Sequence, residues 1–97
     1  MNSPSKRDIH RTKSFAKDLK KQPEDVRRHA WEVAKLLVED IFHPRLSLKK
    51  LLGYENVWRA KVKQDYRLVY TFDGQALYLL RIAHRKDIYQ KPFQELE

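Results

Sequence analysis

The chain has 97 residues, with 21 lysines and arginines against 13 acids and a formal net charge of +8. This length suits one domain with a single small hydrophobic core. The absence of cysteine excludes a disulfide framework and thiolate chemistry. Charges interrupt every apolar stretch before the roughly 18 residues that a membrane-spanning helix needs, and no signal peptide is recognisable, so we expect a cytoplasmic protein without a membrane partner. The basic balance favours nucleic acid or an acidic protein as the partner.

The N-terminal half predicts a short strand followed by two helices. Residues 8–11 form the strand, and Thr12 stands where a helix N-cap accepts a backbone N–H. The first helix stops at Gln22, because Pro23 disfavours helical geometry in the residue before it. The second helix begins at Pro23 and ends near residues 40–42, and apolar residues recur along it at the spacing of one buried stripe. The stripe consists of Val26, Ala30, Val33 and Leu37.

The C-terminal half predicts a meander of three strands. Residues 45–56 are expected to be an ordered connection, after which the apolar period changes to two and a strand runs to residue 62. A turn at 63–65 leads to a second strand over 66–72. Asp73 and Gly74 are typical of a two-residue hairpin turn in which glycine adopts a positive φ, and the third strand continues to about residue 83.

This order of elements indicates one α+β domain covering residues 1–97. We expect a short N-terminal strand, a two-helix hairpin and an antiparallel three-stranded meander that together form one sheet. The helices would cover one face of the sheet, and basic residues would occupy the other. An anion is the natural ligand of such a face.

Cations recur on one side of the first meander strand. Arg59, Lys61 and Lys63 alternate with apolar residues and therefore share a face. They either solvate an exposed sheet surface or hold an anion. The residue types alone leave both interpretations open.

Arg67, in the second meander strand, lies among apolar neighbours. A guanidinium in that position suits a forked contact with phosphate, and an ion pair with Asp65 or Asp87 is the alternative. His84 and Tyr89, near the end of the chain, are candidates for proton transfer, but each also has a plain packing role as an alternative.

Metal and cofactor chemistry find little support in the sequence. The histidines lack the spacing of metal ligands, and the two glycines form no phosphate-binding loop. We therefore predict no metal site and no small-molecule cofactor. The histidines are His10, His29, His43 and His84.

Three segments resemble the RelE/ParE superfamily of bacterial toxin–antitoxin toxins. They are Trp-Arg-Ala-Lys-Val at 58–62, Tyr-Arg-Leu-Val-Tyr at 66–70 and His-Arg-Lys-Asp-Ile-Tyr at 84–89, and the likeness covers nearly the whole chain. It implies a toxin neutralised by a cognate acidic antitoxin. RelE-like members cut messenger RNA on the ribosome, whereas ParE-like members inhibit DNA gyrase, and fold alone does not choose between them.

The RelE-like ribonuclease branch is our expectation, with a gyrase inhibitor or a non-catalytic basic RNA-binding domain as the alternatives. Such a ribonuclease uses the 2′-hydroxyl to attack phosphate without a metal, so it needs a base, an acid and cations. The resemblance carries the catalytic roles, and a contact of Arg59 with the RNA backbone, onto the C-terminal half, and we expect outward lysines to hold the RNA as well. The catalytic candidates are Lys61, Arg67, His84, Arg85 and Tyr89, and the RNA-binding candidates are Lys49, Lys50, Arg59 and Lys63.

Overall fold

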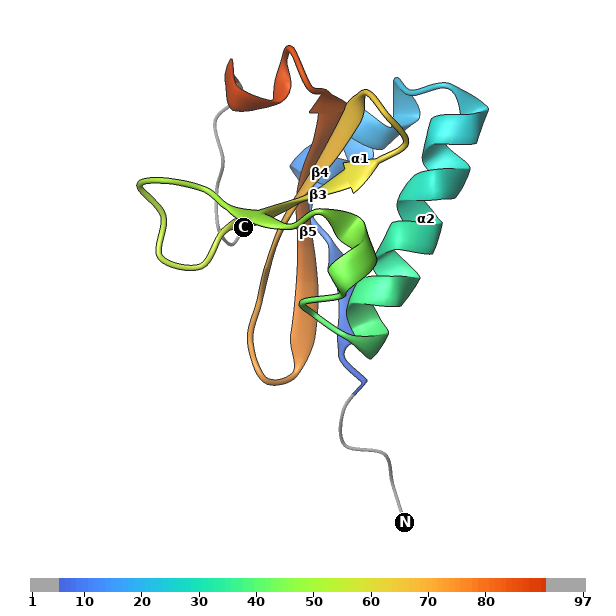
Figure 1. Cartoon of the computed structure of the whole chain (residues 1–97). Coiled ribbons are helices and arrows are strands. Elements are labelled where there is room, and N and C mark those ends of the chain that lie inside the picture. The colour runs from blue at the N-terminus through green and yellow to red at the C-terminus, as the bar shows by residue number, and fades with distance from the viewer. Residues whose placement is uncertain (1–5, 91–97) are drawn as a thin grey trace.

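The computed structural model describes residues 6–90, which form two α-helices and a five-stranded sheet (Figure 1). Two single turns of 3-10 helix, η1 and η2, complete the fold. The α+β class predicted from the sequence is confirmed. The elements are β1 (Asp8–Arg11), α1 (Lys13–Lys20), α2 (Glu24–Glu39), η1 (Pro44–Leu46), β2 (Lys49–Lys50), β3 (Trp58–Val62), β4 (Tyr66–Phe72), β5 (Ala76–His84) and η2 (Ile88–Gln90).

The strands lie in the order β1-β5-β4-β3-β2. β1 runs parallel to β5, while the other neighbouring pairs are antiparallel, so the sheet is mixed. The meander of β3, β4 and β5 agrees with the prediction. The strand count was wrong by one, because Lys49 and Lys50 pair with Arg59 and Trp58 and form the edge strand β2. A strand of two residues is too short to show an alternating pattern in the sequence.

The helices follow their sequence signals closely. Thr12 Oγ1 accepts the N–H of Phe15 at 3.2 Å and caps α1 as predicted. Pro23 is the N-cap of α2, with an extended ψ of 157°, so the helix starts one residue later than expected. No helix in residues 6–90 is both long and apolar enough to cross a membrane. The predicted stripe of α2 is buried along its whole length: Val26, Ala30, Val33 and Leu37.

The sheet is buried on both sides, although unequally. α2 covers one face, and the main core lies between this helix, α1 and the sheet (Figure 1). The opposite face was predicted to be basic, and this is only partly correct. The β2–β3 connection and η2 lie over that face (Figure 1) and enclose a second apolar cluster. Its buried members are Leu51, Val57, Val69, Leu80, Ala83 and Ile88.

A register shift between Val69 and Tyr70 explains the second cluster. Val69 pairs with Arg81 and Tyr70 pairs with Leu79, so Leu80 is the extra residue of a bulge in β5. Leu79 faces the main core while Leu80 joins the opposite cluster. The bulge therefore gives β5 apolar residues on both faces.

The β4–β5 connection differs from the predicted two-residue turn. Three residues separate the strands, and Gly53, not Gly74, is the glycine with a positive φ in the described part of the chain. Asp73 Oδ1 instead accepts the backbone N–H groups of Gln75 and Ala76, each at 2.8 Å. These two bonds lower the pKa of Asp73. A side chain thus closes the turn, and no special backbone conformation is needed.

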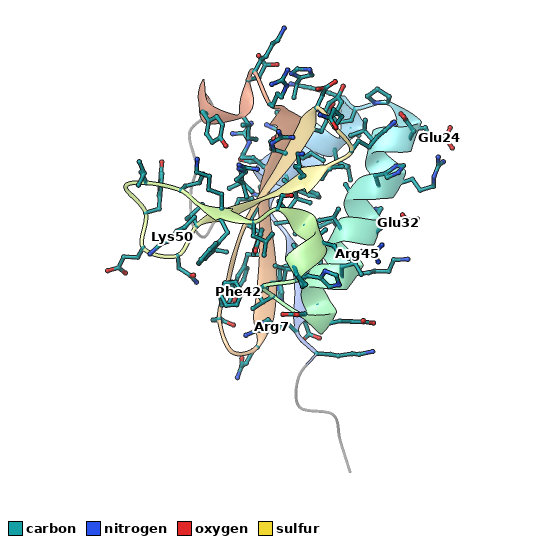
Figure 2. All side chains as sticks on the ribbon, in the orientation of Figure 1. Arg7, Glu24, Glu32, Phe42, Arg45 and Lys50 are labelled. Carbon is teal, nitrogen blue, oxygen red and sulfur yellow. The ribbon has the colours of Figure 1, made fainter. Side chains whose placement is uncertain are left out.

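Aromatic side chains close the base of the main core. Figure 2 shows Phe42 and Arg7 close together at this end of the molecule, where both lie against Phe72. Phe42 also meets the ring of Trp58 edge-on, with 5.0 Å between centroids. The indole N–H of Trp58 donates to Asn56 Oδ1 at 2.9 Å. Trp58 is therefore a packing residue.

A buried ion pair joins α1 to the edge of β5. Asp18 is 2% exposed, and its Oδ2 lies 2.8 Å from Arg81 Nε while its Oδ1 accepts Arg81 Nη2–H at 2.9 Å. The backbone N–H of Ile82 donates to the same carboxylate at 3.1 Å. This contact could not be predicted, because Asp18 stands among exposed lysines on a short helix.

We expect Asp18→Asn to lower the free energy of unfolding by roughly 3–5 kcal/mol, because Arg81 would keep a buried charge without its counter-ion. Urea denaturation at pH 7 measures this loss. Glu32→Gln is the matched control, since Glu32 is an exposed carboxylate of α2, and its effect should stay within about 0.5 kcal/mol. Equal unfolding midpoints for the two variants would contradict the stabilising role of Asp18.

Candidate active site

Cations gather on the sheet face opposite α2, beside the second apolar cluster. Arg59 and Lys61 alternate with core residues of β3 and therefore point away from the helices. Strand pairing sets Lys61 directly opposite Arg67 and Lys49 directly opposite Arg59. We call this patch the basic face. They are Lys49, Arg59, Lys61, Arg67, Arg85 and Tyr89.

Arg67 lies at the centre of the basic face. Its Nη1 donates to the carbonyl oxygens of Gln64 and Tyr66, at 3.1 and 2.9 Å. Partial burial, followed by the charges of Arg59 and Arg85, lowers the pKa of Arg67. Within residues 6–90 no carboxylate forms an ion pair with this guanidinium. The structural ion pair that was the alternative to phosphate binding is therefore not formed.

The side chain of Arg59 forms fewer hydrogen bonds than that of Arg67. Its Nη1 donates to the carbonyl of Ser47 at 3.4 Å, whereas its Nε is buried and has no hydrogen-bond partner among the described residues. A buried donor without an acceptor is costly.

Arg85 and Tyr89 reach the basic face from the C-terminal segment. The backbone N–H of Arg85 donates to Asp65 O at 2.7 Å, and its side-chain Nε lies 3.3 Å from Asp65 Oδ1. Ile88, fully buried in the second cluster, anchors η2. The neighbouring Tyr89 remains 55% exposed, and its phenol interacts electrostatically with Arg67. The structure therefore brings Arg85 and Tyr89 close to Arg67.

His84 lies on the other side of the sheet. It pairs with Tyr66, which packs against the main core, and the two rings meet edge-on with 5.4 Å between centroids. His84 Nδ1 accepts the backbone N–H of Lys86 at 3.1 Å. The structure thus separates His84 from the other catalytic candidates.

Two of the predicted RNA-binding lysines also lie outside the basic face. Lys63 forms an ion pair with Asp25 at the start of α2, and this contact lowers the pKa of Asp25. Lys50 is exposed and pairs with Trp58, whose ring packs on the helix side of the sheet. Lys49 remains on the basic face beside Arg59.

Sequence analysis missed the residues that orient the basic face. The Gln64 carbonyl was treated only as part of a turn, and Asp65 was considered as a partner of Arg67, whereas Gln64 holds Arg67 and Asp65 holds Arg85. The short separation of Asp65 from Arg67 was the available signal.

Among residues 6–90, no group of three or more His, Cys, Asp or Glu side chains could hold a metal ion.

Comparisons with known proteins agree on one family. The family model described as "ParE toxin of type II toxin-antitoxin system, parDE" matches residues 9–89. Toxin RelE3 of Methanocaldococcus jannaschii is 34% identical over 83 residues, which cover 79% of this chain and 89% of that protein.

Solved structures extend the likeness. The RelB-RelE antitoxin-toxin complex from Methanococcus jannaschii matches with a TM-score of 0.70 and 29% identity, over 84% of this chain and 95% of that one. The E. coli DinJ-YafQ complex matches with a TM-score of 0.70 over 87% and 98%, but at 20% identity it shows only a common fold. Fold and sequence together define the toxin component of a type II toxin–antitoxin system. The chain belongs to the RelE/ParE superfamily.

The crowding of like charges predicts a salt effect on stability. Partial burial is the largest cause of the lowered pKa of Arg67, and the charges of Arg59 and Arg85 add to it, so part of the cost of the charged form in the folded protein is like-charge repulsion. Raising NaCl from about 0.05 to about 0.5 M screens this repulsion. We therefore expect added salt to stabilise the wild type more than Arg67→Met, by about 0.5 kcal/mol, as like charges directly opposite on a sheet destabilise it.

Urea denaturation at the two salt concentrations measures this difference, with Arg28→Met as the matched control. Arg28 is exposed on α2 between Glu24 and Glu32, each four residues away, so its removal relieves no repulsion. Glu24, labelled in Figure 2, is the first residue of α2. An identical response to salt in the wild type and Arg67→Met would show that the cations of the basic face do not repel one another measurably.

Proposed function

We propose that this toxin is a ribosome-dependent endoribonuclease that cuts messenger RNA and so inhibits translation. Kinship with Toxin RelE3 at 34% identity supports the RelE-like branch. The observation that carries the proposal is the setting of Arg67. Arg67 stands opposite Lys61, feels the charges of Arg59 and Arg85, and has no carboxylate partner among residues 6–90. A phosphate would neutralise this group of cations.

The side chains of the basic face suit a reaction that needs no metal. The 2′-oxygen attacks the adjacent phosphorus and the 5′-oxygen of the next nucleotide leaves, which produces a 2′,3′-cyclic phosphate. Arg67 and Arg85 would stabilise the charge that develops on the phosphate oxygens, and Lys61 would assist them. Tyr89 would take the proton from the 2′-hydroxyl, since arginine keeps its own proton, and water would protonate the departing 5′-oxygen. His84 remains a separate candidate for proton transfer, on the helix side of the sheet.

The proposed partners are messenger RNA, the ribosome and a cognate acidic antitoxin in the cytoplasm. Two of the matched structures are toxin–antitoxin complexes, which supports an antitoxin as partner. Lys49 and Arg59 would contact the RNA backbone on the basic face, and the exposed Lys50 would extend this contact beyond the sheet edge. Lys63 is a weaker candidate because Asp25 already neutralises it.

Replacement of Arg67 tests the proposal directly. Expression of the wild type without an antitoxin should arrest growth and create new messenger 5′ ends in phase with codons. Arg67→Ala should reduce cutting by roughly 10²–10³-fold, the usual loss when one transition-state donor is removed. Primer extension within minutes of induction measures the cuts. Arg28→Ala is the control, and equal cutting by Arg67→Ala and wild type would remove Arg67 from the reaction.

The chemistry of attack has its own test. A messenger with 2′-deoxyribose only at the mapped cut position should not be cut there, because the nucleophile is missing. The matched control carries the same change one nucleotide downstream and should be cut normally. Cutting at the deoxy position would replace attack by the 2′-hydroxyl with attack by water.

Inhibition of DNA gyrase is the second candidate function, and the ParE description of the matching family model favours it. Under this alternative the basic face would bind protein. A supercoiling assay with purified gyrase separates the two functions. Inhibited supercoiling with intact messages would select the gyrase inhibitor, and neither activity would leave a non-catalytic basic RNA-binding domain.

A further inference from the structure

The β3–β4 turn contacts both arginines that the proposed function places on phosphate. Within the turn Lys63-Gln64-Asp65, the carbonyl of Gln64 accepts Arg67 Nη1–H at 3.1 Å. Asp65 binds Arg85 twice, through its backbone oxygen at 2.7 Å and through Oδ1, which lies 3.3 Å from Nε. A single turn therefore sets the positions of two guanidinium groups, one in β4 and one in the segment that follows β5.

The atom that Asp65 engages decides how Arg85 is presented. Asp65 takes Nε, while neither terminal nitrogen of Arg85 has a partner among residues 6–90. Those terminal nitrogens can point together at phosphate oxygens. The two side chains are 55% and 49% exposed, so the pair adds little to stability. Its main consequence is the orientation of the guanidinium plane.

The other end of the turn is fastened to α2. Lys63 adopts a φ of +56°, a left-handed conformation that is uncommon for a residue with a side chain. Its ammonium group forms an ion pair with Asp25 in the first turn of α2. The helix layer thus holds the turn from one side of the sheet, and Arg85 is held on the other side.

We propose that Asp65 is a positioning residue for Arg85, and that it presents the terminal nitrogens of this arginine to the scissile phosphate. The inference rests on the proposed function, which assigns Arg85 to the phosphate. Asp65 itself touches no reacting atom. It acts by holding one nitrogen of the guanidinium, so that less side-chain freedom is lost when RNA binds.

Asp65→Asn tests this role against the matched control Asp87→Asn. Asp87 is also an exposed acid close to Arg85 in the chain, but it forms no ion pair among the described residues. On ribosomes programmed with messenger, Asp65→Asn should lower kcat by roughly 10- to 100-fold with KM and the thermal midpoint nearly unchanged. Asp65→Glu should recover part of the loss, and Asp87→Asn should equal the wild type. A wild-type kcat in Asp65→Asn would overturn the proposal.

A double-mutant cycle shows whether Asp65 acts through Arg85. In an Arg85→Ala background, Asp65→Asn should cost nothing further, because the group that it positions is gone. A full additional loss in that background would assign Asp65 a role independent of Arg85, and would therefore overturn the proposal.

Nitrogen-15 NMR of the arginine Nε–H groups tests the orientation of Arg85 independently of any ribonuclease activity. Asp65→Asn should speed solvent exchange of the Arg85 Nε–H at least several-fold, and Asp87→Asn should not. If the wild type cuts no messenger, the proposed function fails, and the exchange rates alone decide whether Asp65 orients Arg85. Equal exchange in the wild type and Asp65→Asn would overturn the orientation.

Discussion

The buried carboxylate of Asp18 allows a short strand to share an edge with a long one. β1 has four residues and β5 has nine, so the backbone of β5 extends beyond its partner. Thr12 donates its N–H and its hydroxyl to the carbonyl of Leu79, and Asp18 then accepts the N–H of Ile82. Arg81 neutralises the carboxylate. α1 therefore continues the edge of the sheet, and its lysines are left to face solvent.

The bulge in β5 connects the packing of the sheet to the chemistry of the basic face. It turns Leu80 towards the second apolar cluster, where Ile88 is fully buried. That burial fixes η2, which brings Tyr89 into electrostatic contact with Arg67. Apolar packing and crowded cations thus occupy neighbouring parts of one sheet face. The cations repel one another, and the adjacent cluster offsets this cost.

Local sequence signals predicted the parts of the fold that local interactions determine. Three features could be predicted because each depends on residues close in the chain. They are the Thr12 cap, the apolar stripe of α2 and the alternation around Arg59. The family resemblance added Arg85 and Tyr89 beside Arg67. The partner of Asp18 could not be predicted, since Arg81 is 63 residues away in the chain.

The side of the sheet on which His84 lies could not be predicted from the sequence either. Its side depends on the register of β5 against β4, and the bulge shifts that register by one residue. A single-residue shift moves every later side chain to the opposite face. The edge strand β2 was not predicted for another reason: Lys49 and Lys50 acquire their strand conformation from pairing with β3.

The parallel pairing of β1 with β5 also determines when the protein can become active during its own synthesis. Thr12 and Leu79 are 67 positions apart, so the first strand has no partner until almost the whole chain exists. Contacts of such long range close late in folding. Arg85 and Tyr89 follow β5 and join the basic face last. The toxin therefore lacks a complete basic face until β5 and the segment after it have been made.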